Sequence, residues 1–182
     1  MRIWIAATLI VLGSSPAFAQ VTGLKSTVSS MNAYSTQAKL KATFKGGNCK
    51  AGDGGFVCDI TVKGADLAQP YSFTATYHGK AGPAARFTML IPDTDQAAGA
   101  ALGTAVGASI LTGEMFDSAE VSAFIAQEMQ AAIAQNRPQV QPVNGVQFTV
   151  SKSGDFGFEV EIEKAGKPQP AAKPAKPAKP KK

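Results

Sequence analysis

Apolar and polar residues alternate with a period of two over much of the chain. The first two runs, residues 40–45 and 56–63, flank a glycine-rich turn and predict a hairpin with one face in the core and one in water. Residues 71–77 and 85–91 continue the pattern, so four consecutive antiparallel strands are expected. The alternation returns over residues 148–163, around the turn segment Ser-Lys-Ser-Gly-Asp, and predicts a second hairpin.

A helical pattern separates the fourth predicted strand from the fifth. Asp93 and Asp117 each precede an apolar run and are followed three residues later by Gln96 and Glu120, a spacing typical of helix caps. Gly113 fits the end of the first helix. The expected fold is therefore α+β, an antiparallel sheet of about six strands with two helices inserted between strands four and five and packed on one face. The second helix has an apolar stripe for covering the sheet, formed by Val121, Phe124, Ile125, Met129, Ala132 and Ile133.

The first of these helices carries glycine at positions 99, 103 and 107 within an uncharged run. An interior glycine costs about 1 kcal/mol relative to alanine in a helix, so a close contact must offset Gly99, Gly103 and Gly107. Residues 97–111 would span about 22 Å, short of a hydrocarbon thickness of about 30 Å. The spacing favours a buried helix packed closely on the sheet or on the second helix. The alternatives are a self-associating or membrane-inserting element and a partly irregular loop.

The chain begins like an exported protein. A short basic start precedes an apolar stretch from Ile3 to Leu12, and an Ala-x-Ala site ends at Ala19. This order is typical of a secretory signal peptide, so residues 1–19 are expected to be removed. We expect the remainder to be periplasmic or secreted and to fold as a single domain over residues 20–164.

The two cysteines fit that destination. Cys49 and Cys58 are separated by eight residues, three of them glycines. Because an exported chain meets an oxidising environment, we expect a disulfide that staples the first hairpin. A redox pair or two metal ligands are the alternatives, but the spacing is not Cys-x-x-Cys and His78 is the only histidine. No metal ion or cofactor is expected.

The net charge of +5 belongs to the C-terminal end. Without Arg2 and six lysines among the last sixteen positions, 11 basic and 13 acidic residues remain, so no nucleic-acid surface is expected on the folded part. Residues 165–182 are expected to be a disordered Lys/Pro-rich tail, in which proline favours polyproline II and sets lysines about 9 Å apart. Such a row suits an anionic envelope polymer or membrane surface; a merely solvated extension is the alternative. Its lysines are Lys164, Lys167, Lys173, Lys176, Lys179 and Lys182.

Sequence motifs of catalysis are missing. The chain has no Gly-x-Ser-x-Gly, His-Glu-x-x-His or phosphate-binding loop, and His78 has no partner at a recognisable spacing. Helix capping accounts for most acidic residues near the helix starts; a calcium site is the alternative, without the spacing of an EF-hand. We expect a non-enzymatic binding or interaction protein of the cell envelope, with a possible protein partner. A carrier that holds a small apolar ligand between sheet and helices, and a hydrolase that uses His78, are the alternatives.

Overall fold

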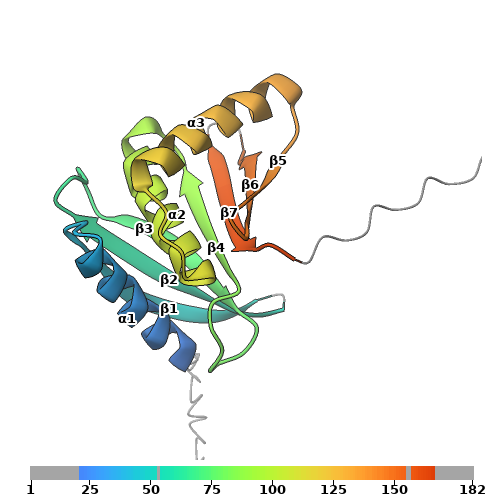
Figure 1. Cartoon of the computed structure of the whole chain (residues 1–182). Helices are drawn as coiled ribbons and strands as arrows, with labels where there is room; N and C mark the ends of the chain where they lie inside the picture. Colours follow the sequence, from blue (N-terminus) through green and yellow to red (C-terminus); the bar gives the residue numbers. More distant parts are fainter. Residues whose placement is uncertain (1–20, 53, 155–156, 167–182) are drawn as a thin grey trace, which may run out of the picture.

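The strands of the chain join in one antiparallel sheet, and three helices lie against one face of it (Figure 1). The computed structural model describes residues 21–52, 54–154 and 157–166. The predicted signal peptide and the tail beyond Gly166 lie outside these residues. The elements, in chain order, are α1 (Thr22–Gln37), β1 (Ala42–Gly52), β2 (Gly55–Gly64), β3 (Tyr71–Tyr77), β4 (Arg86–Ile91), a 3₁₀ turn (Thr94–Gln96), α2 (Ala97–Thr112), α3 (Ser118–Gln135), β5 (Gln139–Val143), β6 (Val146–Lys152) and β7 (Phe158–Lys164).

The sheet has the strand order β1-β2-β3-β4-β7-β6-β5. The first four strands pair as consecutive neighbours, and α2 and α3 then carry the chain to the far edge, so the last three strands return towards β4. The predicted α+β fold is confirmed, including the two helices between strands four and five. The structure adds a seventh strand, β5, and a helix before the sheet, α1, neither of which was predicted.

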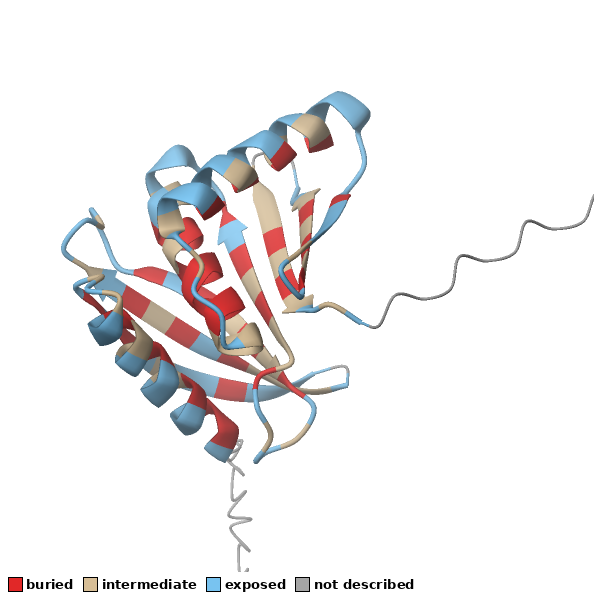
Figure 2. Cartoon of the chain, in the orientation of Figure 1, coloured by how far each residue is buried: buried red, intermediate tan, exposed pale blue. Residues whose placement is uncertain are grey.

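The core lies between the sheet and the helices. Inward residues of every strand from β2 to β4 and of β6 and β7 are buried, and they alternate with exposed or half-buried residues on the other face, as Figure 2 shows. Asp117 caps α3 by accepting hydrogen bonds from the amides of Ala119 and Glu120. Asp93 caps the short 3₁₀ turn before α2 rather than α2 itself. Gly113, at φ 81°, ends α2.

The glycine face of α2 lies directly on the sheet. A Cβ atom added at Gly99 would lie 2.5 Å from Tyr71 Cβ, and one at Gly107 would lie 2.8 Å from Ile162 Cδ1. At Gly103 the nearest atoms belong to an aromatic ring of β3, at 3.4 Å. Glycine therefore lets the helix backbone approach bulky side chains that alanine would displace at two of the three positions. None of the helices in the described part of the chain is long and apolar enough to cross a membrane.

Both edges of the sheet are protected against further pairing. Asn32 of α1 accepts a hydrogen bond from the Phe44 amide at 2.8 Å and donates one to the Phe44 carbonyl at 2.9 Å. Ser35 does the same for Ala42, with its hydroxyl 2.6 Å from the carbonyl oxygen and 3.3 Å from the amide nitrogen. Two side chains thus replace a neighbouring strand along the start of β1. On the opposite edge β5 contains Pro142, which has no N–H to offer.

The predicted disulfide is present. Cys49 and Cys58 face each other across β1 and β2 and are bonded, and the chain has no free cysteine. A bulge between Gly46 and Cys49 shifts the register of β1 just before the bonded pair. The bond is compatible with an oxidising, exported location.

Candidate functional site

A cleft of about 650 Å³ opens between α1, the loop from β3 to β4 and the end of α2. Its volume lies in the range of sites that bind small molecules. One wall carries three hydroxyls of α1, the opposite wall carries aliphatic side chains of α2, and the end of β7 adds two charged residues. We call it the hydroxyl cleft; it is lined by Ser26, Thr27, Ser30, His78, Gly79, Gly82, Pro83, Ala84, Ala85, Ile110, Leu111, Glu163 and Lys164.

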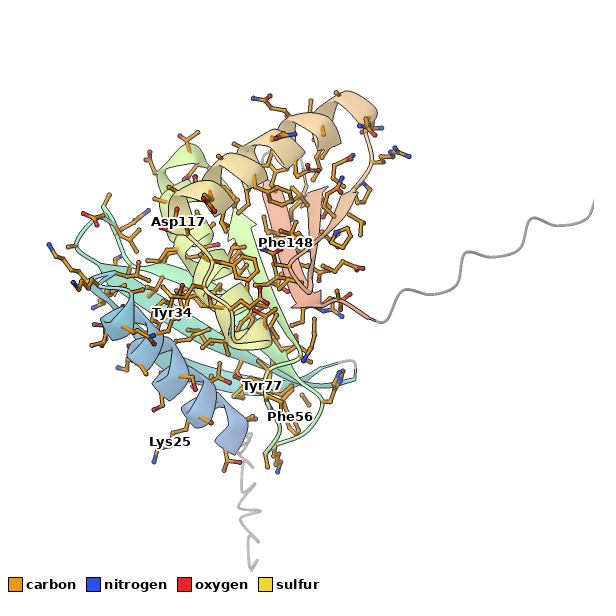
Figure 3. All side chains as sticks on the ribbon, viewed as in Figure 1. Lys25, Tyr34, Phe56, Tyr77, Asp117 and Phe148 are labelled. Carbon is orange, nitrogen blue, oxygen red and sulfur yellow. A yellow bond between two sulfur atoms is a disulfide. The ribbon has the colours of Figure 1, made fainter. Side chains whose placement is uncertain are left out.

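The phenol of Tyr77 lies near Thr27, one of the residues that line this cleft. Tyr77 is the last residue of β3, and Figure 3 labels it between α1 and the loop that follows β3. The residue is 0% exposed, and its hydroxyl has no hydrogen-bond partner among the described residues. Burial raises the pKa of Tyr77, and the nearby side chain of Thr27 offsets part of that shift. The two hydroxyls are therefore close, but they do not form a hydrogen bond of acceptable geometry.

The other core tyrosine of β3 shows that this arrangement is unusual within the molecule. Tyr71 is 3% exposed, and its hydroxyl donates a hydrogen bond of 2.7 Å to the Leu90 carbonyl. Burial raises the pKa of Tyr71 as well. A buried hydroxyl without a partner costs about 1–3 kcal/mol, so natural structures seldom retain one without a ligand or water to satisfy it. Thr27, whose side chain is near the Tyr77 hydroxyl, also lines the hydroxyl cleft, so the unsatisfied phenol lies next to this cleft.

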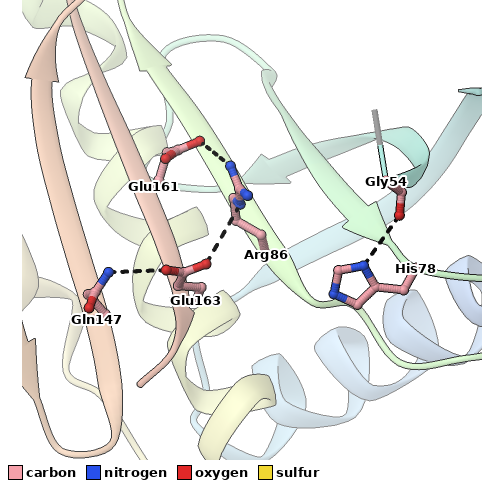
Figure 4. Close-up of polar contacts among 6 residues, drawn as sticks. All are labelled: Gly54, His78, Arg86, Gln147, Glu161 and Glu163. Carbon is pink, nitrogen blue, oxygen red and sulfur yellow. Dashed lines mark hydrogen bonds and ion pairs between the residues drawn. The ribbon is translucent and has the colours of Figure 1, made fainter. Parts of the chain in front are cut away.

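The charged residues at the rim of the cleft belong to β7. Glu163 accepts a hydrogen bond from Gln147 at 3.1 Å and lies 4.0 Å from the Arg86 guanidinium (Figure 4). Lys164 is exposed and forms no ion pair with any residue that the structure describes. It is also the one predicted tail lysine within the described residues; Lys167, Lys173, Lys176, Lys179 and Lys182 lie outside them.

His78 lines the cleft without a catalytic partner. Its Nδ1 atom lies 3.3 Å from the Gly54 carbonyl in the turn between β1 and β2 (Figure 4). Within the described segments, no hydrogen bond connects His78 to a serine or a carboxylate, which a nucleophile and its base require. The same residues contain no group of three or more His, Cys, Asp or Glu side chains placed to hold a metal ion.

A second polar surface lies on the face of the sheet opposite the helices, which we call the open face. Glu159, Glu161 and Glu163 alternate along β7, and Arg86 of the neighbouring strand is 2.8 Å from Glu161. Partial burial, reinforced by the Glu161 charge, raises the pKa of Glu159, whereas the hydrogen bond to Glu161 raises the pKa of Arg86. On the open face, Arg86 therefore pairs with Glu161 and lies near Glu163. The third carboxylate, Glu159, has a raised pKa because its ionised form is disfavoured.

The hydroxyl cleft was not predicted from the sequence, because helix α1 was not predicted either. The available signal was the spacing of Ser26, Ser30 and Thr27, which places small hydroxyl residues on adjacent turns of a helix. The glycines of α2, Gly99, Gly103 and Gly107, lie outside the hydroxyl cleft, on the helix face that packs on the sheet, which is the role that their spacing predicts. No protein-family model, curated protein or solved structure matches this chain. Its function is therefore inferred from the geometry of its own residues.

Proposed function

We propose that the protein is a non-enzymatic binding protein of the cell envelope and that the hydroxyl cleft is its ligand site. The observation that supports this proposal is the Tyr77 hydroxyl, which is fully buried without a partner beside a cleft of about 650 Å³. Because the hydroxyl has no exposed surface, a ligand in the cleft supplies this partner only when Thr27 or another lining side chain moves aside; it then gains a hydrogen bond and removes a desolvation cost that the free protein bears. The disulfide, compatible with an exported location, and the predicted signal peptide support the periplasm as the compartment.

The lining favours a small neutral ligand with hydroxyl or carbonyl groups. Ser26, Thr27 and Ser30 offer hydroxyls that both donate and accept hydrogen bonds, whereas Ile110 and Leu111 offer apolar contact on the opposite wall. A ligand with several charges is not favoured, because the hydroxyl and aliphatic walls are neutral and the Glu163 carboxylate is already paired with Gln147 and Arg86. Short neutral sugars have this combination of hydroxyl groups and apolar faces and are the first probes to test.

The geometry supports binding rather than turnover. His78 is the histidine that lines the cleft, and its Nδ1 atom faces a backbone carbonyl instead of a serine hydroxyl. The alternative of an apolar carrier gains no support from the interface beneath α2, because Tyr71, Phe87 and Ile162 lie against the helix backbone there.

The experiment is a titration of the isotope-labelled protein with a panel of neutral mono- and disaccharides, followed by amide chemical shifts. We expect saturable shifts at residues 26–30 and 78–85 and an about two- to twelvefold weaker affinity for Tyr77→Phe, the effect of losing one hydrogen bond of about 0.5–1.5 kcal/mol. Tyr71→Phe is the matched control, since its hydroxyl is already bonded to Leu90. Saturable shifts that avoid the cleft, or equal affinity for Tyr77→Phe and the unchanged protein, would contradict the assignment.

A further inference from the structure

A smaller cleft lies where the loop between α2 and α3 meets the turn between β5 and β6. Its volume is about 160 Å³. Phe116, Phe124 and Phe148 supply aromatic rings, and Phe124 packs edge-on against Phe148 at 5.2 Å between ring centroids. Asp117 and Glu120 are exposed at its rim, and no basic residue of the described chain lines it. We call this the acidic cleft: an apolar hollow with a negative rim.

The C-terminal tail leaves the described part of the chain beside this cleft. After β7, the Ala165 amide donates a hydrogen bond of 2.8 Å to the Gly145 carbonyl. Gly145 follows Asn144, which lines the acidic cleft, and Figure 1 shows the chain leaving the sheet from the end of β7. Sixteen residues, 167–182, follow Gly166. At about 3.1 Å per residue in polyproline II they span about 50 Å, far more than is needed to reach the cleft.

The composition of the tail complements the acidic cleft. Residues 167–182 contain only Lys, Pro, Ala and Gln, with proline and lysine adjacent in repeated Ala-Lys-Pro units. Proline-rich segments dock in grooves lined by aromatic side chains, because their extended conformation is already restricted before binding. Lysine side chains gain from nearby carboxylates, and Glu114 adds a third exposed one next to Met115 at the rim.

The acidic residues of the open face form a poorer alternative site for the tail. Arg86 already bonds Glu161 and lies within 4.0 Å of Glu163, which leaves Glu159 as the carboxylate without a cation. Two of the three negative charges are therefore already compensated. An extended segment on this face would also meet the polar side chains of the sheet rather than an apolar hollow.

We propose that residues 167–182 dock in the acidic cleft of their own chain, with a proline against Phe116 and Phe124 and lysines beside Glu120 and Asp117. This interaction is separate from ligand binding in the hydroxyl cleft. Docking occupies part of the lysine row, so an anionic polymer or surface must displace the tail to bind all of its charges. Because lysines and carboxylates contribute to it, docking weakens as the salt concentration rises.

The test compares two full-length mature chains by amide chemical shifts, one unchanged and one with Lys173→Gln, Lys176→Gln and Lys179→Gln. We expect shift differences at residues 114–124 and 143–146 at low salt and their loss at 1 M salt, where the Debye length is about 3 Å. Differences confined to Glu159–Glu163 would place the tail on the open face, and differences that grow with protein concentration would assign it to a second copy. Either result, or identical spectra, overturns the proposal.

Two charge reversals provide matched controls. Glu120→Lys is expected to abolish the difference between the two tails, because it reverses the charge at the rim of the acidic cleft. Glu159→Lys reverses a carboxylate of the same type on the open face and is expected to leave the difference intact. Retention of the difference in Glu120→Lys, or its loss in Glu159→Lys, would contradict docking in the acidic cleft.

Discussion

Replacing each buried tyrosine of β3 by phenylalanine tests the central observation directly. Both side chains lie in the core at 3% exposure or less, and both changes remove a single oxygen atom. Tyr71→Phe removes a hydrogen bond of 2.7 Å to Leu90, whereas Tyr77→Phe removes a hydroxyl that has no partner in the described structure. The two variants are therefore matched in burial, strand and chemistry, and they differ in hydrogen bonding.

The expected effects have opposite signs. Losing a hydrogen bond lowers the free energy of unfolding by about 1 kcal/mol for Tyr71→Phe. Removing an unsatisfied buried hydroxyl recovers a desolvation cost of about 1–3 kcal/mol, so Tyr77→Phe is expected to be neutral or more stable than the unchanged protein. The variants should then differ by about 2 kcal/mol, which corresponds to about 6 °C in melting temperature for a domain of this size.

The assay is thermal unfolding followed by circular dichroism, with the disulfide intact and no ligand added. A destabilisation by Tyr77→Phe as large as that by Tyr71→Phe would refute the reasoning, because it would mean that the Tyr77 hydroxyl is bonded in solution, to Thr27 or to a held water molecule. Thr27→Val separates those two possibilities. If Thr27 is the partner, Tyr77→Phe should have no further effect in the Thr27→Val background.

Five further substitutions test other parts of the fold. Gly99→Ala should lower the free energy of unfolding by about 1–3 kcal/mol because its Cβ meets Tyr71 at 2.5 Å. Gly103→Ala, whose Cβ would make an ordinary contact with Phe73 at 3.4 Å, should be neutral or stabilising; chemical denaturation compares the two variants. Cys58→Ala should cost about 2–3 kcal/mol in the same assay and leave sugar binding unchanged. Glu159→Gln should raise the melting temperature at pH 7, and the gain should vanish as the pH falls towards 4, because a carboxyl with a raised folded pKa destabilises the fold only where it is ionised. Asn32→Ala should expose the edge of β1 at Phe44 and produce self-association, measured by sedimentation, whereas a monomer of unchanged stability would argue against edge protection.

The sequence predicted the elements whose buried face is apolar. Strands β2, β3, β4 and β7 alternate cleanly, and α3 has both its Asp117 cap and an apolar stripe. Strand β5 escaped prediction because Pro142 normally argues against a strand, and an edge position is where proline is tolerated. Pairing of β4 with β7, which brings Phe87 opposite Ile162, depends on contacts between residues far apart in sequence that no local pattern records.

Helix α1 was not predicted because it is rich in polar residues, and the same residues form one wall of the hydroxyl cleft. Its sequence is rich in serine and threonine, which have modest helix propensity, and its buried positions include Thr27 and Ser35 beside Leu24 and Met31. An apolar stripe on this helix could not bond the free backbone groups of β1, a task that Asn32 and Ser35 perform here. It could not supply hydroxyls to the cleft either.

The polar composition of α1 therefore has three effects. It makes the helix hard to predict from sequence, it supplies the side chains that bond the edge of β1, and it supplies hydroxyls to the hydroxyl cleft. Because α1 is held by tertiary contacts more than by its own propensity, its position, and with it the wall of the hydroxyl cleft, depends on the hydrogen bonds to β1. Loss of the Asn32 bonds should consequently weaken ligand binding as well as edge protection, although Asn32 does not line the cleft.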